Sequence, residues 1–136
     1  MYKSILVPVD VSSPDQGKQS LALAHKMGGK DAHITMLAVI EDVPSYVLAQ
    51  LPLGMIEKAE EKAGLDLHEI AKAAGVKAEL VVRLGHAAST ILSLAEDKSV
   101  DLIVIASHRP GLQDYFLGST ASRVVRHAPC SVLVMR

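Results

Sequence analysis

Five short apolar runs, each of strand length, alternate along this chain with segments of helical periodicity, and this alternation restricts its fold more than any other feature. The runs are continuous and rich in β-branched residues, which is typical of strands buried on both faces of a parallel sheet. They span Ser4–Val9, His33–Ile40, Lys77–Arg83, Asp101–Ala106 and Ser131–Met135. Because crossovers between parallel strands are almost always right-handed, this order predicts a single α/β domain over residues 1–136. We expect a five-stranded, mostly parallel open sheet with helices on both faces.

The first predicted helix shows both of its ends in the sequence. Ser13 or Asp15 is placed to cap it, and Pro14 suits its first turn. Gly28 and Gly29 follow the last apolar residue of the helical pattern and predict its end.

Two further helices are predicted from their apolar faces. The segment Ile56–Ala74 gathers apolar residues on one face with Glu and Lys opposite. That face holds Ile56, Ala59, Ala63, Leu67, Ile70 and Ala74. The last helix, Ser119–His127, is predicted to turn Val124 and Val125 inward. The segment Val43–Gly54 is too irregular to assign, and a mobile lid, a packed connection and an oligomer interface all stay open for it.

Charge and cysteine content exclude several classes of function. With 14 basic and 15 acidic residues the net charge is −1, so non-specific binding to nucleic acid is not expected. No apolar run approaches the ~18 residues of a membrane span, and Pro8 interrupts any signal-peptide core. Cys130 is the single cysteine, which excludes an intrachain disulfide, and the histidines show no metal-ligand spacing. We therefore expect a cytoplasmic protein that binds neither nucleic acid nor membrane.

Ligands of open α/β sheets bind beyond the carboxyl ends of the strands, where the strand order reverses. The strongest candidate there is Gly118 followed by Ser119, at the start of the last helix. Gly118 lets the backbone approach a ligand without a Cβ, and the first amides of a helix point outward with a partial positive charge. This arrangement predicts an anion site, although a purely structural role, in which Ser119 only caps the helix, stays open.

The residues that follow the fourth strand extend this anion site. Ala106 and Ser107 are small and keep the strand exit open, while His108 and Arg109 place donors beside the predicted anion. Arginine can hold two phosphate oxygens at once. Each of these two basic residues also has an ordinary interpretation, His108 as a turn residue and Arg109 as a solvated surface charge.

Other strand ends add candidates of a different kind. The carboxylate of Asp10 can accept hydrogen bonds from ribose hydroxyls or hold a metal ion carried by phosphates; it can also be a helix cap or a loop acid. Pro8 lacks an amide donor, which indicates that strand pairing ends there. Val39 can offer backbone groups to a base edge, or is simply a core valine. For Gly85, room for a ligand and a simple turn fit equally well.

Several stretches together carry a family resemblance: "SILVPVD", "ITMLAVI", "VDLIVIASHRP" and "LGSTASRVVRHAPCSVLVMR". On these stretches and the β/α alternation between them, the chain resembles the universal stress protein family from end to end. It looks most like the short, single-domain bacterial members of the F and G type. The resemblance implies the adenine-nucleotide alpha-hydrolase-like fold, which is Rossmann-like, and a part in the cellular stress response.

The phosphate loop of this chain departs from the better-known family pattern. Nucleotide-binding members carry a motif of the form G-x2-G-x9-G-[S/T] that wraps the phosphates of ATP. Here Gly118 and Ser119 keep the final pair, whereas Ala106 stands at the first glycine and Arg109 at the second, with a following interval one residue shorter. The loop itself resembles the F and G branch, in which arginine occupies this place and nucleotide binding is still expected.

The resemblance implies an ATP site, with any magnesium ion reaching Asp10 through the nucleotide. The residues expected to line this site are Pro8, Val9, Asp10, Val39, Gly85, Ala106, Ser107, His108, Arg109, Gly118, Ser119 and Thr120. The resemblance also implies a homodimer through the last strand, Ser131–Met135, or a tetramer. An apolar edge strand needs cover in any case, which favours the same interface.

Two other functions compete with that of an ATP-binding stress protein. One is an oligomeric interaction protein that has lost nucleotide binding, and the other is a slow ATPase. Neither a G-x-x-x-x-G-K-[ST] loop nor a G-x-S-x-G elbow occurs, so an enzymatic role rests on Asp10, His108 and Arg109 alone. A flavodoxin-like carrier is disfavoured because flavin-stacking aromatic residues are scarce.

Overall fold

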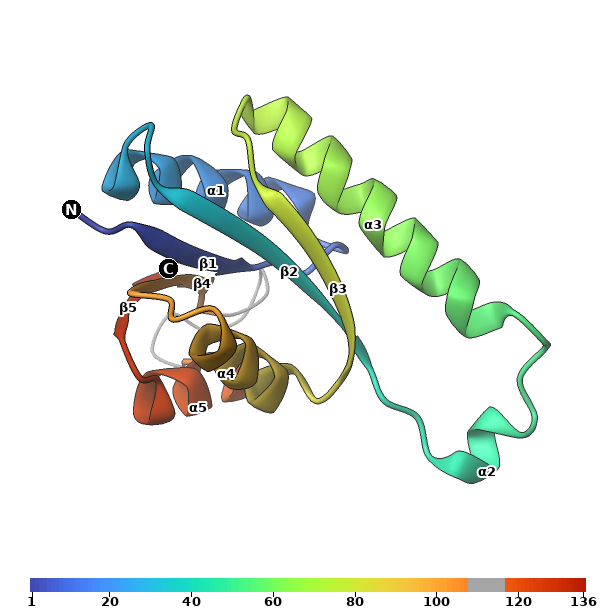
Figure 1. Ribbon diagram of the computed structural model, residues 1–136. Coiled ribbons are helices and arrows are strands. Elements are labelled where there is room, and N and C mark those ends of the chain that lie inside the picture. The colour runs from blue at the N-terminus through green and yellow to red at the C-terminus, as the bar shows by residue number, and fades with distance from the viewer. Residues whose placement is uncertain (108–116) are drawn as a thin grey trace.

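A single sheet of five strands forms the centre of the computed structural model, which describes residues 1–107 and 117–136 (Figure 1). Its strands are β1 (Ser4–Pro8), β2 (His33–Glu41), β3 (Glu79–Gly85), β4 (Leu102–Ala106) and β5 (Ser131–Met135). The order across the sheet is β3-β2-β1-β4-β5, and every pairing is parallel. The predicted α/β fold is confirmed, and "mostly parallel" becomes parallel throughout.

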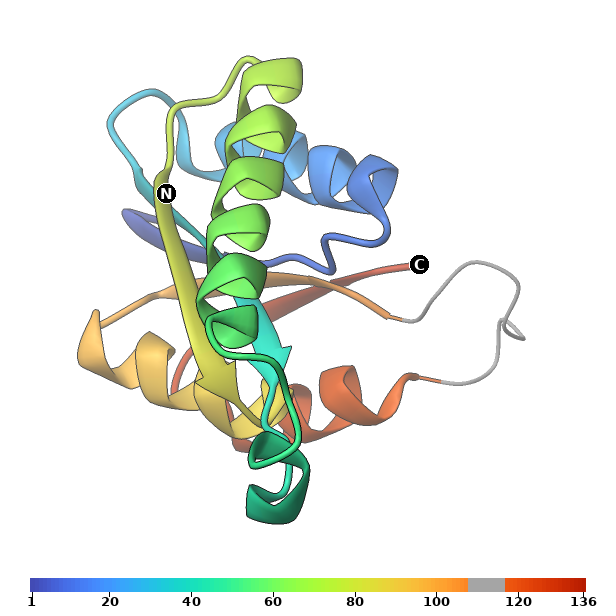
Figure 2. The same cartoon turned by 90° about the vertical axis from the view of Figure 1, so that its right-hand side faces the viewer.

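Helices cover both faces of this sheet. The helices are α1 (Pro14–Gly28), α2 (Ser45–Leu48), α3 (Met55–Ala74), α4 (Ala87–Asp97) and α5 (Ser119–His127). Figure 2 shows α1 and α3 on one side of the strands and α4 and α5 on the other. Alternate strand residues serve the two faces, so Ile5 and Val7 join the core beneath α1 and α3, while Leu6 joins the core beneath α4 and α5. No helix among the described residues is long and apolar enough to cross a membrane.

The ends of α1 follow the sequence closely. Ser13 is the N-cap residue, without a side-chain capping hydrogen bond, and Pro14 opens the helix. Gly28 is its last residue, and Gly29 follows with a φ of 77°, a left-handed value that favours glycine.

Two predictions of inward-facing residues are wrong. Val124 is buried, but Val125 is 47% exposed, because α5 turns only a narrow stripe toward the sheet. Ala59 is exposed as well, because the buried residues of α3 begin only at Ala63. The first turns of α3 extend past the sheet edge toward α2, as Figure 1 shows, so they have no core beneath them.

The strand order reverses between β1 and β4. From β1 the chain builds β2 and β3 to one side, then crosses to build β4 and β5 on the other. The register between β1 and β4 is short, pairing Ile5 with Leu102 and Leu6 with Ile103. Toward their carboxyl ends, the described residues of the two strands form no further pair. A crevice at this place is where α/β sheets bind their ligands.

The opposite ends of β1 and β4 are tied together by Asp101. Its carboxylate accepts hydrogen bonds from the backbone N–H of Lys3 (2.9 and 3.2 Å) and of Ser4 (3.0 Å). Burial acts to raise the pKa of this carboxyl, but the N–H donors outweigh it and hold the pKa below its usual range.

An acid-dependent loss of stability is expected from this tie. Because the folded pKa of Asp101 is depressed, its contribution is present above the unfolded-state pKa and is lost as pH falls through the folded value. We expect Asp101→Asn to be less stable than the wild type at pH 7 and to lose less stability below pH ~4. Urea unfolding at several pH values measures this difference. Parallel curves for the two proteins would show that the tie does not contribute.

Candidate functional site

A cavity of about 540 Å³ lies at the carboxyl ends of β1, β2 and β4, beside the starts of α4 and α5. Its volume falls in the range of small-molecule sites. It is lined by Pro8, Val9, Asp10, Val11, Gln16, Gly17, Ser20, Leu37, Ala38, Val39, Ile40, Glu41, Ala63, Ala87, Ile91, Ile105, Ala106, Ser107, Gly118, Ser119, Thr120 and Ala121. The cavity therefore occupies the crevice that the reversed strand order creates.

Most of the site residues expected from the sequence meet at this cavity. They are Pro8, Val9, Asp10, Val39, Ala106, Ser107, Gly118, Ser119 and Thr120. Gly85 does not line it. Its φ of +149° favours glycine, and a Cβ there would lie 2.7 Å from Thr90 Oγ1, so its small size accommodates Thr90. His108 and Arg109 lie outside the described residues.

The start of α5 presents unpaired backbone donors to this cavity. Gly118 is the N-cap residue, and the first helical bond runs from Ser122 N–H to Gly118 O at 2.9 Å. The amides of Ser119, Thr120 and Ala121 therefore precede the first hydrogen-bonded turn, and all three residues line the cavity. The structural alternative, in which Ser119 is the N-cap, is wrong, because Gly118 is the N-cap and Ser119 is the first helical residue.

The base of the neighbouring loop is closed by two backbone hydrogen bonds. Ser107 N–H donates to Met135 O, and Gly118 N–H donates to Ser107 O, each at 2.7 Å. Gly118 thus uses its own amide within the protein. At the start of α5, the backbone donors left for an anion are those of the next three residues.

Val39 directs its backbone toward the cavity because of its place in the ladder. Asp42 N–H donates to Gly85 O at 3.2 Å, so even-numbered residues at the end of β2 direct their backbone groups toward β3. Odd-numbered residues face β1, where Val9 N–H donates to Leu37 O at 2.8 Å. That bond is the last rung between β1 and β2 among the described residues. The N–H and C=O of Val39 lie beyond it, at the open edge of the cavity.

Pro8 and Asp10 shape the end of β1. Even-numbered residues of β1 direct their backbone toward β4, as the bond from Asp101 N–H to Ser4 O shows. Pro8 lies past the last β1–β4 pair, so the missing N–H breaks no ladder bond, in agreement with the prediction that pairing ends here. Asp10 then turns the chain, since its Oδ1 accepts from Ser12 N–H (3.0 Å) and Ser12 Oγ (2.6 Å). The loop-acid interpretation of Asp10 therefore holds alongside its place in the cavity lining.

Sequence reasoning missed the part of the lining that α1 and α4 supply. Gly17 lies where a Cβ would come within 2.8 Å of Val9 Cγ1, so its lack of a side chain lets α1 approach the end of β1. A glycine early in a helix that follows a strand was the available signal. Ala87 and Ile91 of α4 add apolar wall.

The charged groups of the described lining are both acidic. Asp10 and Glu41 line the cavity, and no lysine or arginine from residues 1–107 or 117–136 does so. Glu41 lies 3.9 Å from His86 Nδ1 in an exposed pair, which contributes little stability. Within the same described ranges, no group of three or more His, Cys, Asp or Glu side chains is placed to hold a metal ion.

A second, shallower hollow of about 770 Å³ lies at the opposite ends of the strands, around Tyr2, Asp101 and Cys130. The carboxylate of Asp101 already accepts the N–H bonds of Lys3 and Ser4. Burial raises the pKa of the Cys130 thiol, with the Asp101 charge adding to the effect, so the less reactive thiol form is favoured. The smaller cavity is therefore the candidate functional site.

Comparisons with known proteins agree with this architecture. A family model described as "Universal stress protein family" matches residues 1–136. "Universal stress protein G" of Escherichia coli O157:H7 is 31% identical over 144 residues, covering 100% of both chains. The structure of universal stress protein UspA from Lactobacillus plantarum has a TM-score of 0.73 at 28% identity, with 99% of this chain and 98% of that chain covered. The universal stress protein of Archaeoglobus fulgidus in complex with dAMP shares the fold, with a TM-score of 0.67 at 19% identity and coverage of 99% and 98%.

Proposed function

The chain belongs to the universal stress protein family, and we propose that it binds an adenine nucleotide, ATP above all, in the cavity beyond β1 and β4. One observation carries this proposal. The cavity brings the free amides at the start of α5 together with the outward-facing backbone of Val39, and apolar side chains line it as well. An anion site joined to a slot for a planar base fits a nucleotide better than an anion or an apolar ligand alone.

The base belongs at the end of β2. The N–H and C=O of Val39 form an adjacent donor and acceptor, which match the N1 acceptor and N6 donor of adenine. Val39, Ile91 and Ala87 supply apolar contact for the faces of the ring. A complex of a family relative from Archaeoglobus fulgidus with dAMP supports adenine as the base.

The phosphates belong at the N-terminus of α5. The amides of Ser119, Thr120 and Ala121 can donate to phosphate oxygens, and the helix dipole favours their negative charge. Magnesium carried by the nucleotide would offset phosphate charge, with the Asp10 carboxylate as the described group suited to it. His108 and Arg109, which lie outside the described residues, are proposed to add donors to the terminal phosphates.

The nucleotide serves as a regulatory ligand of an oligomer in this proposal. The strand β5 is an edge strand, and its residues Val132–Met135 are only partly buried. A homodimer that joins two β5 edges would cover them. The protein would act in the cytoplasm as part of a stress response, with hydrolysis of ATP slow or absent.

Direct measurement of nucleotide content and affinity tests the proposal. The protein, purified without added nucleotide and then denatured, is expected to release adenine nucleotide that absorbs at ~260 nm, or else to bind added ATP with magnesium in calorimetry. GTP should bind at least tenfold more weakly, because guanine presents an acceptor where adenine presents the N6 donor. Neither carried nucleotide nor heat at millimolar ATP would exclude the proposal. That result would favour the nucleotide-free interaction protein, for which the altered glycine pattern around Arg109 is the supporting feature.

A further inference from the structure

Residues 43–56, called the arm here, are free of charged side chains. They run from Val43 through α2 to Ile56, and most of them are apolar. The arm leaves the carboxyl end of β2 and stands off from the sheet before the chain returns into α3 (Figures 1 and 2). An uncharged segment of this length on a protruding part of a protein is unusual, because surface segments normally carry charges.

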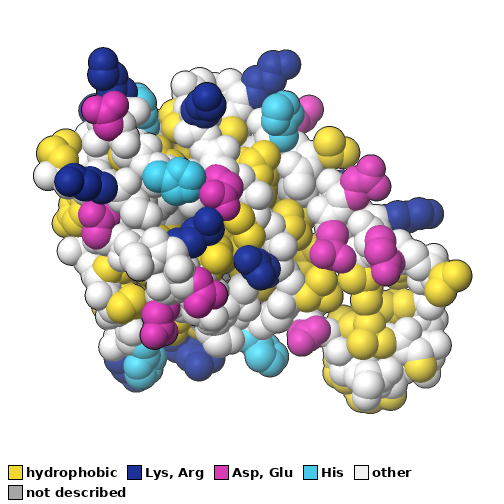
Figure 3. Space-filling model, in the orientation of Figure 1, with side chains coloured by type: hydrophobic (Ala, Val, Ile, Leu, Met, Phe, Trp, Pro, Cys, Tyr) yellow, Lys and Arg dark blue, Asp and Glu magenta, His cyan; other side chains and the backbone are white. Residues whose placement is uncertain are grey.

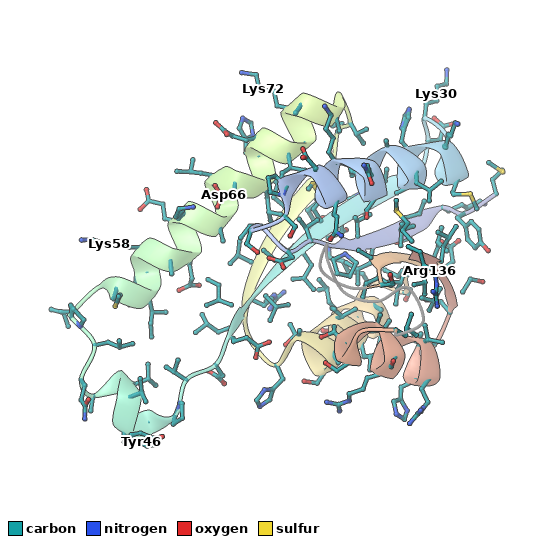
Figure 4. All side chains as sticks on the ribbon, turned by 180° about the vertical axis from the view of Figure 1, so that it is seen from behind. Lys30, Tyr46, Lys58, Asp66, Lys72 and Arg136 are labelled. Carbon is teal, nitrogen blue, oxygen red and sulfur yellow. The ribbon has the colours of Figure 1, made fainter. Side chains whose placement is uncertain are left out.

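The body of the protein leaves the arm uncovered. The helix α2 has no buried residue. The exposed fractions are 71% for Tyr46, 39% for Leu48, 103% for Leu53 and 48% for Met55. Figure 3 shows apolar side chains gathered over this projection, and Figure 4 shows Tyr46 at its tip, directed away from the sheet.

The exposed area is large enough for a specific contact between two copies. Tyr46 alone presents roughly 110–180 Å², since a tyrosine carries about 150–250 Å². With the two leucines and Met55, the exposed apolar area reaches on the order of 500 Å², the size of the largest apolar patch on a typical monomer, which is often functional. A specific interface needs about 1,000 Å² in total, or about 500 Å² from each copy.

The charges around the arm favour a second copy over a lipid surface. Glu41 and Asp42 precede the arm, and Glu57 and Lys58 follow it, so its borders carry a net negative charge that repels an anionic membrane. In a two-fold contact, each residue near the axis meets the same residue of the partner. A charged residue there would be repelled by the identical charge of the partner. The arm holds no such charge.

We propose that the arm is a self-association surface, in which the arms of two copies pair across a two-fold axis through Tyr46, Leu53 and Met55. This contact is separate from the β5 edge and does not depend on nucleotide binding. Where both contacts form, two two-fold axes generate a tetramer.

Two single variants and their double variant separate the arm contact from the β5 contact. Leu53→Glu places a carboxylate within the arm pair and is expected to weaken that association at least 100-fold. Val132→Pro removes an outward-facing amide of the β5 edge, which an edge strand tolerates. Sedimentation velocity over a concentration series measures the association of each variant. Leu53→Glu is expected to associate only through β5, and Val132→Pro only through the arm. The double variant is expected to be a monomer.

Leu65→Glu is the matched control. Leu65 is 61% exposed on α3, outside the arm, so the same change there should alter self-association less than twofold. Association of Leu53→Glu equal to that of the wild type, or equal losses in both leucine variants, would overturn the proposal. It would also be overturned if Val132→Pro stayed monomeric and bound phosphatidylserine vesicles in a manner that Leu53→Glu abolished. If the β5 dimer does not form, Val132→Pro should self-associate as the wild type does. That outcome would exclude the β5 contact without affecting the arm contact.

Discussion

Replacing Ser119 with proline is expected to lower the affinity for ATP by about 10- to 150-fold while leaving the fold intact. Ser119 is the first residue of α5, where proline is favoured because its missing amide has no helical partner. Gly118 has φ −58° and ψ 156°, a conformation that a residue before proline adopts readily. A hydrogen bond to a charged group contributes about 1.5–3 kcal/mol, which corresponds to this loss of affinity.

Two controls isolate the backbone donor in this experiment. Ser119→Ala keeps the amide and removes only the hydroxyl, so it should lose less affinity than the proline variant. Thermal unfolding without ligand should place both variants close to the wild type. Calorimetry with ATP measures the affinities, and equal binding by wild type and Ser119→Pro would remove this amide from the proposed phosphate site.

Ile103→Ala is expected to lower the free energy of unfolding by about 2–5 kcal/mol, a large part of the 5–15 kcal/mol of a typical domain. Ile103 is fully buried in β4, in register with Leu6 of β1 and Val132 of β5. Both faces of this central strand are covered by helices, so the cavity left by the lost atoms cannot collapse easily.

Graded substitutions test the cause of this loss. Ile103→Val, which removes one methyl group, should cost about 0.5–1.5 kcal/mol, and Val125→Ala on the exposed side of α5 at most about 0.5 kcal/mol. Urea unfolding gives all three values. An Ile103→Ala loss no greater than that of Val125→Ala would mean that β4 is not a rigid part of the core.

The elements of the fold could be read from the sequence because their signals are local. Continuous β-branched runs marked the strands, and the glycine pair Gly28-Gly29 marked the end of α1. Misassigned faces occurred where a helix leaves the sheet or packs by a narrow stripe. Ala59 fits the apolar pattern of α3, yet only the position of the sheet edge decides that nothing lies beneath it.

The candidate site was predictable in its parts and not in its geometry. A strand end can be recognised in sequence, and parallel strands bring their carboxyl ends to one edge, so Asp10, Val39, Ala106 and Ser119 were expected to meet. Gly17 and Ile91 were missed because their place depends on how closely α1 and α4 pack on the strands. Gly85 has the same sequence signal as a site glycine, but its conformation and Thr90 account for it.

The sequence by itself determined the α/β class and the number of strands, because local periodicity and turn chemistry specify these. The exact strand ends followed less closely: the third strand, predicted over Lys77–Arg83, spans Glu79–Gly85. Only the tertiary structure decided that Gly118 rather than Ser119 caps α5, that Val39 directs its backbone past the last rung of β1, and that residues 43–56 stand clear of the core. Each of these depends on register and on the presence or absence of a neighbour across space, which no pattern within a single segment contains.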